Sequence, residues 1–341
     1  MPALPPKFDD VAALEEFMSR PSPSLVADLA GIDGDLIVLG VSGKMGPTLA
    51  RMAKRAAPSK RVIGVARFSE PGLADQLSGH GIECLRCDLL DGDAIERLPK
   101  VRNVVYMAGH KFGAIDNASL TWAMNAAVPF MVAEAFRQSR IVVFSTACVY
   151  PYVDVASSGA TEQTPATPPA GDYANSCVGR ERMFEHGSRK HQTPGRLVRL
   201  SYAIDMRYGV LHDVASAVVA GTPIDLTMGY ANVIWQGDAN EQSLRLLAHC
   251  TAPTSPLNVT GPRVVVRELA AEFGRRLERT PVLTGAEAQT AWLLDTRESQ
   301  RMFGPPSVPL DTMIDWVAAW VASGKPSLGK ATHFSTRDGN Y

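Results

Sequence analysis

The chain has 341 residues, 45% of them hydrophobic, and its 34 basic side chains nearly balance its 35 acidic ones. This composition is typical of a globular protein and excludes a disordered one, while a net charge of −1 gives no basic surface for nucleic acid. The first residues contain no apolar leader and no run reaches the roughly 18 apolar residues of a membrane span, so we expect a cytoplasmic protein with no membrane partner.

Short apolar runs alternate with longer amphipathic stretches, a pattern typical of a parallel sheet covered by helices. We expect an N-terminal helical extension over residues 1–33, then strands at 35–40, 61–66, 82–87, 103–107, 141–145 and 196–200. Helices are predicted at 44–57, 119–138, 172–191, 211–220, 240–250, 265–277 and 309–323. A segment rich in Pro and Thr at 157–171 predicts a surface loop.

This order of elements predicts an α/β fold: a Rossmann-type doubly wound parallel sheet with a smaller C-terminal substrate-binding region. The dinucleotide-binding domain is expected to span residues 34–200, with parts of 225–250 returning to it. Residues 201–325 are expected to form mainly the substrate-binding region, and residues 326–341 a polar tail.

Five cysteines are few and odd in number for a chain of this length, which favours reduced thiols over disulfides. Cys84 and Cys87 lie near His80, but no second pair of Cys or His completes a zinc site. On a strand, an offset of three residues also puts the two thiols on opposite faces. We therefore expect no metal centre.

The strongest chemical signal is a predicted strand that runs directly into glycines and then into a helix, at residues 35–50. Glycines allow a sharp turn and a close approach of a pyrophosphate to the positive end of the helix. A glycine-rich turn that binds nothing is the alternative, but a second predicted strand follows at the spacing of a dinucleotide site. The cofactor-binding residues expected here are Gly40, Gly43, Lys44, Met45 and Gly46.

The end of the second predicted strand bears on the choice of cofactor. An NAD-selective fold normally places an acid there for the ribose 2′-hydroxyl, whereas a basic residue accommodates the 2′-phosphate of NADP. This chain has Arg67 and no acid directly after the strand. We therefore expect NADP to be favoured, with NAD possible; a plain surface arginine is the alternative.

The spacing Gly-x-x-Gly-x-x-Gly resembles the extended short-chain dehydrogenase/reductase family, in its NAD(P)-dependent epimerase/dehydratase-like branch. The segments CDLLD at 87–91 and VVYMAGHK at 104–111 deepen the resemblance, and Asn125 matches an asparagine in the helix that follows. The resemblance implies further cofactor contacts from Asp88, Leu89, Ala108, Gly109 and Lys111. It extends over roughly residues 34–323 and implies a homodimer in which helices 119–138 and 172–191 pair across a twofold axis.

The segment VFSTACVY at 143–150 is similar to the part of the family that carries the catalytic hydroxyl, which aligns with Thr146. Tyr173 then aligns with the tyrosine of Tyr-x-x-x-Lys, a general acid/base that also contacts the cofactor, and Cys177 takes the place of the lysine. The pKa of a free phenol is near 10, so a positive charge is needed to lower it, and a thiol supplies none. Arg180 falls on the same helical face as these two residues and is a candidate replacement, unless it pairs with a surface acid.

These residues predict an NAD(P)-dependent oxidoreductase or epimerase that transfers hydride at a hydroxyl or ketone carbon of a sugar-like, polyhydroxylated substrate. Ala147 and Cys148 stand where family dehydratases and decarboxylases carry acids, which disfavours elimination. Substrate contacts are expected from Thr146, Tyr202, Arg207 and Trp235. A redox-silent NADP-binding regulatory protein, or a non-redox lyase or isomerase on the same fold, are the alternatives.

Overall fold

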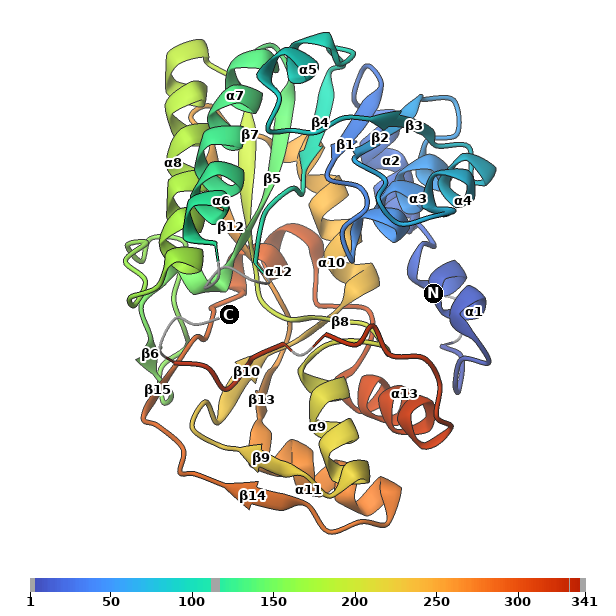
Figure 1. Ribbon diagram of the computed structural model, residues 1–341, viewed down its shortest axis with the longest axis vertical. Coiled ribbons are helices and arrows are strands. Elements are labelled where there is room, and N and C mark those ends of the chain that lie inside the picture. Colours follow the sequence, from blue (N-terminus) through green and yellow to red (C-terminus); the bar gives the residue numbers. More distant parts are fainter. Residues whose placement is uncertain (1–3, 112–116, 331, 338–341) are drawn as a thin grey trace.

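A computed structural model describes residues 4–111, 117–330 and 332–337 of the chain. One parallel sheet of seven strands, in the order β12-β7-β5-β4-β1-β2-β3, forms its centre (Figure 1). The strands are β1 (Leu36–Leu39), β2 (Val62–Ala66), β3 (Glu83–Arg86), β4 (Asn103–Tyr106), β5 (Arg140–Thr146), β7 (Gly195–Leu200) and β12 (Ser255–Val259). Six of them confirm the predicted strands; β12, which completes the sheet beside β7, was not predicted.

Both faces of the sheet are buried at β1 and β2, which explains why these strands are apolar throughout rather than alternating. Leu36 and Val38 of β1 pack into one core cluster, and Ile37 and Leu39 into another on the opposite face. The first face is covered by α2 (Pro23–Ala30), α3 (Gly46–Ala56), α4 (Leu73–Gly79) and α10 (Gln236–Arg245), which continues as a 3₁₀ turn at Leu246–His249. The second is covered by α5 (Gly92–Arg97), α7 (Val128–Ala135) and α8 (Asp172–His191). Helix α6 (Ala118–Trp122) reaches α7 through a π-helical segment, Ala123–Ala127.

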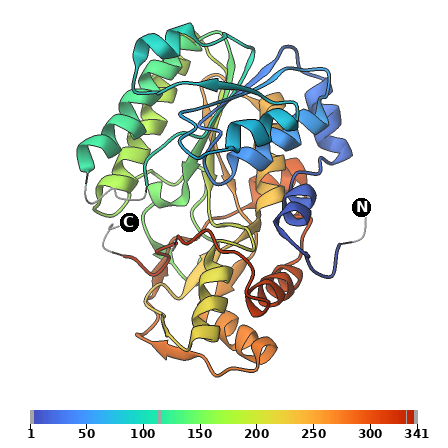
Figure 2. The ribbon, with the colours of Figure 1, turned by 45° about the vertical axis from the view of Figure 1, so that its right-hand side comes forward.

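A smaller lobe lies beyond the carboxyl ends of the strands, below the sheet in Figures 1 and 2. Its core is built around the buried Trp316 and Trp320. The lobe contains α9 (Val210–Ala220), α11 (Val266–Leu277) and α13 (Leu310–Ala322). Paired short strands complete it: β8 (Ala203–Ile204) with β11 (Ile234–Trp235), β9 (Pro223–Asp225) with β14 (Val282–Thr284), and β10 (Tyr230–Asn232) with β13 (Arg263–Val265).

The remaining short elements connect the two parts. β6 (Val153–Asp154) pairs with β15 (Thr290–Ala291), and α12 (Arg297–Phe303) follows. Helix α1 (Val11–Met18) packs in the core of the lobe, whereas α2 packs on the sheet, so the N-terminal segment contacts both parts. Near the other end of the chain, residues 326–330 and 332–337 lie across the front of the molecule between the sheet and the lobe (Figure 1).

The predicted separation of Cys84 and Cys87 is observed: the first packs against the α3 face of the sheet and the second against the α7 face. Within the described ranges, no three His, Cys, Asp or Glu side chains gather as a metal site would require. Nor does any helix in this described part combine the length and apolar character that a membrane crossing requires.

Candidate active site

The turn from β1 to α3 depends on two glycines. Gly40 has a φ of +90°, and a β-carbon there would lie 2.6 Å from the backbone nitrogen of Ala108 on β4's carboxyl side. A β-carbon on Gly46 would lie 2.2 Å from the carbonyl oxygen of Val41. Helix α3 begins at this turn with no side chain capping its first amides. The turn therefore has the shape that fits the diphosphate of a dinucleotide at the start of a helix.

Strands β2 and β3, on one side of β1, are followed by exposed polar residues that would face the far end of such a cofactor. Arg67 follows β2 and is exposed, and Asp88 follows β3, where its carboxylate accepts from the amide of Leu90 at 3.0 Å. Arg86 donates from Nη1 to the carbonyl oxygen of Arg67 at 2.6 Å, a neighbour that was not predicted. Leu89 is buried in the core beneath α7. Two guanidinium groups thus lie at the end of β2.

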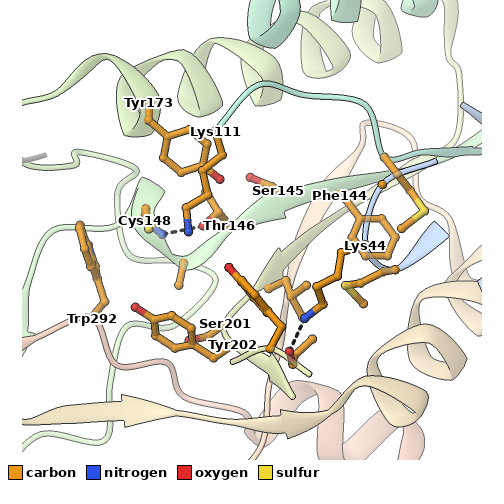
Figure 3. Close-up of a pocket in the computed structure, with 17 residues that line it drawn as sticks. Lys44, Lys111, Phe144, Ser145, Thr146, Cys148, Tyr173, Ser201, Tyr202 and Trp292 are labelled. Atoms are coloured by element: carbon orange, nitrogen blue, oxygen red, sulfur yellow. Dashed lines mark hydrogen bonds between the residues drawn. The ribbon is translucent and has the colours of Figure 1, made fainter. Parts of the chain in front are cut away.

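A cavity of about 270 Å³ opens beside the glycine turn, at the carboxyl edge of the sheet (Figure 3). It brings together predicted residues that are far apart in the sequence, namely Gly43, Lys44, Met45, Lys111, Thr146, Tyr173 and Tyr202. It is also lined by residues that were not predicted, among them Met107, Phe144, Ser201 and Trp292. The described lining contains two lysines and no carboxylate, so the cavity suits anionic or polar ligands.

Thr146 and Tyr173 lie together at one end of this cavity (Figure 3). Thr146 ends β5, and its Oγ1 accepts from the backbone nitrogen of Cys148 at 3.2 Å in the 3₁₀ turn Ala147–Val149. Tyr173 projects from the first turn of α8. Burial raises the pKa of Tyr173 well above its ordinary value, and the neighbouring thiols of Cys177 and Cys148 raise it further. The phenol is therefore strongly held in its protonated form.

Cys177 and Arg180 do not line the cavity. Cys177 is fully buried, and burial raises the pKa of its thiol to about 11, so it carries no charge near neutral pH. Arg180 is buried beneath Gly109: it donates from Nη1 to the carbonyl oxygen of Phe144 at 2.8 Å and from Nη2 to Oδ1 of Asn125 at 2.6 Å. A β-carbon on Gly109 would lie 2.3 Å from that Nη2. Glycine at position 109 therefore makes room for the guanidinium.

Asn125 was singled out in the sequence, and the structure shows what it contacts. Its Nδ2 donates to the carbonyl oxygen of His110 and to the hydroxyl of Ser176, while its Oδ1 accepts from the amide of His110 as well as from Arg180. It lies in the π-helical segment, a local widening that is common at functional sites. Asn125 thereby joins the loop after β4 to α8.

A buried ionic network, which was not predicted, supports the end of β5. Glu181 accepts from Ser145 at 2.6 Å and from Nη2 of Arg199 at 2.7 Å. Arg199 also donates to the hydroxyl of Tyr150 at 2.8 Å, and Tyr150 donates to Asn258. Because Ser145 immediately precedes Thr146, this network fixes the strand that presents the Thr146 hydroxyl.

Two of the predicted substrate contacts lie elsewhere. Arg207 pairs with Asp205 at 2.7 Å and with Glu15 of helix α1 at 2.8 Å. Trp235 is buried in an aromatic cluster with Phe8 and Trp316 of the lobe. Neither side chain lines the cavity, whereas Tyr202 does.

A doubly wound parallel sheet with a glycine turn between its first strand and the following helix defines a Rossmann-type dinucleotide-binding protein. The model of the NAD dependent epimerase/dehydratase family matches residues 36–207, and the chain belongs to this family. This confirms the resemblance seen in the sequence: the protein is an enzyme of the extended short-chain dehydrogenase/reductase type. No curated protein matches the chain significantly.

Solved structures of this type share the fold at low sequence identity. DesIV, a dTDP-glucose 4,6-dehydratase from Streptomyces venezuelae with NAD bound, is 19% identical with a TM-score of 0.73, over 84% of this chain and 97% of that one. The UDP-glucose 4-epimerase of Thermus thermophilus with NAD is 19% identical with a TM-score of 0.69, over 84% and 98%. The UDP-glucuronic acid 4-epimerase of Bacillus cereus is 14% identical with a TM-score of 0.72, over 85% and 99%.

Proposed function

We propose that this enzyme is an oxidoreductase or epimerase that acts on a hydroxyl or ketone carbon of a sugar-like, polyhydroxylated substrate. The observation that carries the proposal is that Thr146 and Tyr173 share one cavity with the glycine turn. When bound, a nicotinamide would supply hydride exchange there. The Tyr173 phenol can exchange a proton with the substrate oxygen while the Thr146 hydroxyl donates a hydrogen bond to the same oxygen.

One observation supports a sugar-like substrate, and a second disfavours elimination chemistry. The solved neighbours include proteins named for dTDP-glucose, UDP-glucose and UDP-glucuronic acid. The described cavity lining carries hydroxyls on Thr146, Ser201, Tyr202 and Tyr208, but no carboxylate to serve as the second acid or base of a dehydration. Oxidation, reduction and epimerisation remain as the reactions this lining can perform.

The proposed cofactor preference is NADP. Arg67 is exposed at the end of β2, and Arg86 holds its carbonyl oxygen, so two guanidinium groups lie near the position of the ribose 2′-phosphate. Titration calorimetry with NADP and NAD tests the preference. An affinity for NAD equal to or greater than that for NADP would contradict it.

The direct test of the proposed function is a spectrophotometric screen of sugars, sugar acids and nucleotide sugars with oxidised and reduced cofactors. Tyr173→Phe is expected to bind cofactor with unchanged affinity and to lose at least about a hundredfold of turnover, since general acid–base catalysis typically contributes that much. A Tyr173→Phe variant that retains activity would refute the assignment.

A second candidate is a redox-silent, cofactor-binding regulatory protein. The observation that favours it is the strongly raised pKa of Tyr173 beside an uncharged Cys177. Tight NADP binding together with no turnover of any substrate class in the screen would support this candidate over catalysis.

We further propose that the enzyme is a homodimer formed through α6, α7 and α8. Trp122 and Phe130 leave 41% and 42% of their surfaces exposed on these helices, an unusual exposure for large apolar side chains. Sedimentation equilibrium tests this: the wild type is expected as a dimer and Phe130→Glu as a monomer.

A further inference from the structure

Helix α8, which carries Tyr173, contributes no cation to the described lining of the cavity. One turn along this helix lies Cys177, which is buried and uncharged near neutral pH. A further turn along lies Arg180, whose Nη1 and Nη2 atoms donate to Phe144 and Asn125 beneath Gly109. A cation that acts on the Tyr173 phenol from within the cavity must therefore come from another element.

Two lysines are the cations among the described residues that line the cavity. Lys44 lies at the glycine-turn end, where its Nζ donates to the carbonyl oxygen of Ala203 at 2.7 Å and lies 4.2 Å from the ring centre of Tyr208. Lys111 follows β4, and its Nζ lies 5.9 Å from the ring centre of Tyr173. Figure 3 shows Lys111 between Tyr173 and Thr146, so it lies at the end of the cavity where a proton would be exchanged.

The C-terminal segment contacts Lys111 at this position. Lys111 donates from Nζ to the carbonyl oxygen of Thr332 at 3.4 Å. Thr332 is itself anchored, because its amide and its hydroxyl both donate to Oδ2 of Asp213, at 2.9 and 2.6 Å. Asp213 lies in the first turn of α9 in the lobe. This contact therefore links a lysine of the sheet domain, through the tail, to a carboxylate of the lobe.

The tail is anchored on the other side of the cavity as well. Arg337 donates from Nη1 to the carbonyl oxygen of Thr290 at 2.6 Å, and its guanidinium lies 4.2 Å from the ring centre of Tyr152. The Tyr152 hydroxyl donates to the carbonyl oxygen of Arg337 at 3.0 Å. The ring of Tyr152 packs at a tilt against Trp292, which lines the cavity.

We propose that Lys111, held by the C-terminal segment through Thr332 and Asp213, supplies at Tyr173 the positive charge that the lysine of Tyr-x-x-x-Lys supplies in the family. The proposal rests on the proposed function and deepens it by assigning a positioning residue to the same site. A cation near the phenol favours the phenolate, so Tyr173 can accept a hydroxyl proton from substrate at a lower pH. For two unit charges 5.9 Å apart, the distance from Nζ to the ring centre, Coulomb's law with an effective dielectric constant of about 20 gives a change of about two in the pKa.

Other titratable groups face the same two side chains. Burial raises the pKa of Tyr173, and Cys177 of α8 and Cys148 of the turn after β5 raise it further, whereas the charge of Arg180 on α8 lowers it. The two thiols and Asp213 favour the charged form of Lys111, while burial lowers its pKa. Lys44, at the other end of the cavity, and Lys111 repel each other, and this repulsion helps to lower the pKa of Lys44. The net effect of Lys111 must therefore be isolated by substitution at Lys111 itself.

The test is the titration of the Tyr173 phenol, followed by NMR in protein carrying ¹³C-labelled tyrosine, with Tyr173→Phe used to assign the resonance. Relative to wild type, Lys111→Met is expected to raise the titration midpoint by about one unit or more, and Lys111→Arg to restore it. Lys54→Met, which removes a lysine on α3 far from the cavity, is the matched control and is expected to leave the midpoint unchanged. Identical titration curves for wild type and Lys111→Met, including no titration in either below pH 11, would overturn the proposal.

The contribution of the tail is tested separately. Asp213→Asn and a chain ended after Lys330 are each expected to shift the midpoint in the same direction as Lys111→Met, by a smaller amount. Cys177→Lys in the Lys111→Met background is expected to restore the wild-type midpoint. Because this readout requires no turnover, a chain that never turns over a substrate refutes the proposed function but leaves the charge at Tyr173 measurable. Where turnover is found, the acidic limb of the kcat/KM profile for oxidation is expected to move with the NMR midpoint.

Discussion

The two ends of the cavity follow the family pattern to different degrees. At the glycine end, Gly40 and Gly46 are held against backbone atoms, so the local shape allows no side chain. At the proton-exchange end, Thr146 and Tyr173 lie in the cavity, but the lysine position holds Cys177 and a lysine from another loop lies nearby. A backbone constraint must be met at its own position in the sequence, whereas a charge can come from any element that reaches the site.

The largest effect is expected when a side chain is introduced at the glycine end, where the backbone constraint applies. Gly46→Ala puts a β-carbon against the carbonyl oxygen of Val41, and the three nearest atoms are all backbone atoms of Val41, which cannot turn aside as a side chain could. We expect loss of cofactor binding and a free energy of unfolding lowered by about 3 kcal/mol or more. Urea denaturation and calorimetry measure these two quantities.

Gly79→Ala is the matched control for this change. A β-carbon there meets no atom within 4 Å, so we expect wild-type cofactor affinity and an unchanged or slightly higher stability. A Gly46→Ala protein that binds cofactor as the wild type does would show that the turn is not the phosphate site.

We expect the stability of the structure around the proton-exchange end to depend on the buried ion pair of Glu181 and Arg199. Glu181→Gln leaves the Arg199 guanidinium buried without its counter-charge, so we expect the free energy of unfolding to fall by about 3–5 kcal/mol. Glu185→Gln on the same helix removes a partly exposed partner of Arg182 and is expected to cost less than about 1 kcal/mol. Equal losses in the two variants, measured by denaturation, would show that the network does not support β5.

We expect cofactor binding to depend more weakly on the charge of Lys44, at the glycine end of the cavity. Burial lowers the pKa of Lys44 to about 7, so the lysine is charged below that pH and becomes neutral above it in the free protein. A cofactor diphosphate favours the charged form, and binding above pH 7 therefore requires proton uptake. We expect the dissociation constant to rise with pH from about 7, by at most about tenfold per unit.

Lys44→Met is expected to weaken binding at pH 6 and to remove this pH dependence, as calorimetry in buffers of different ionisation enthalpy can measure. Lys54→Met should retain it. If the dissociation constant of Lys44→Met still rose with pH, the proton taken up on binding would belong to another group.

Local patterns were sufficient for most of the fold. Strands β1 and β2 are short apolar runs, and α8 begins and ends at the predicted residues, 172 and 191. The strand β12 begins with Ser and Pro and was not predicted, because its place beside β7 is decided by packing rather than by its own composition. Tertiary partners also decide where side chains go: Arg207 meets Glu15, and Trp235 meets Phe8, both from the N-terminal segment.

At the site, the sequence predicted the residues that share a motif but not those that meet only in space. Thr146 and Tyr173 carry a recognisable local pattern and line the cavity. Trp292 and Thr332 come from segments with no motif of their own, and no periodicity connects them to the cavity. Helical spacing put Arg180 on the face of Tyr173, but the depth to which it is buried depends on Gly109 and Asn125 of other elements.

The packing of the N-terminal segment limits where this chain can be truncated. The family model begins at residue 36, which invites a truncation there. Such a cut would remove Leu14 and Met18 from the lobe and Leu25 and Leu29 from the sheet, all of them almost completely buried. The truncation would expose two apolar surfaces, one on the lobe and one on the sheet. We expect the truncated enzyme to be recovered mainly from inclusion bodies.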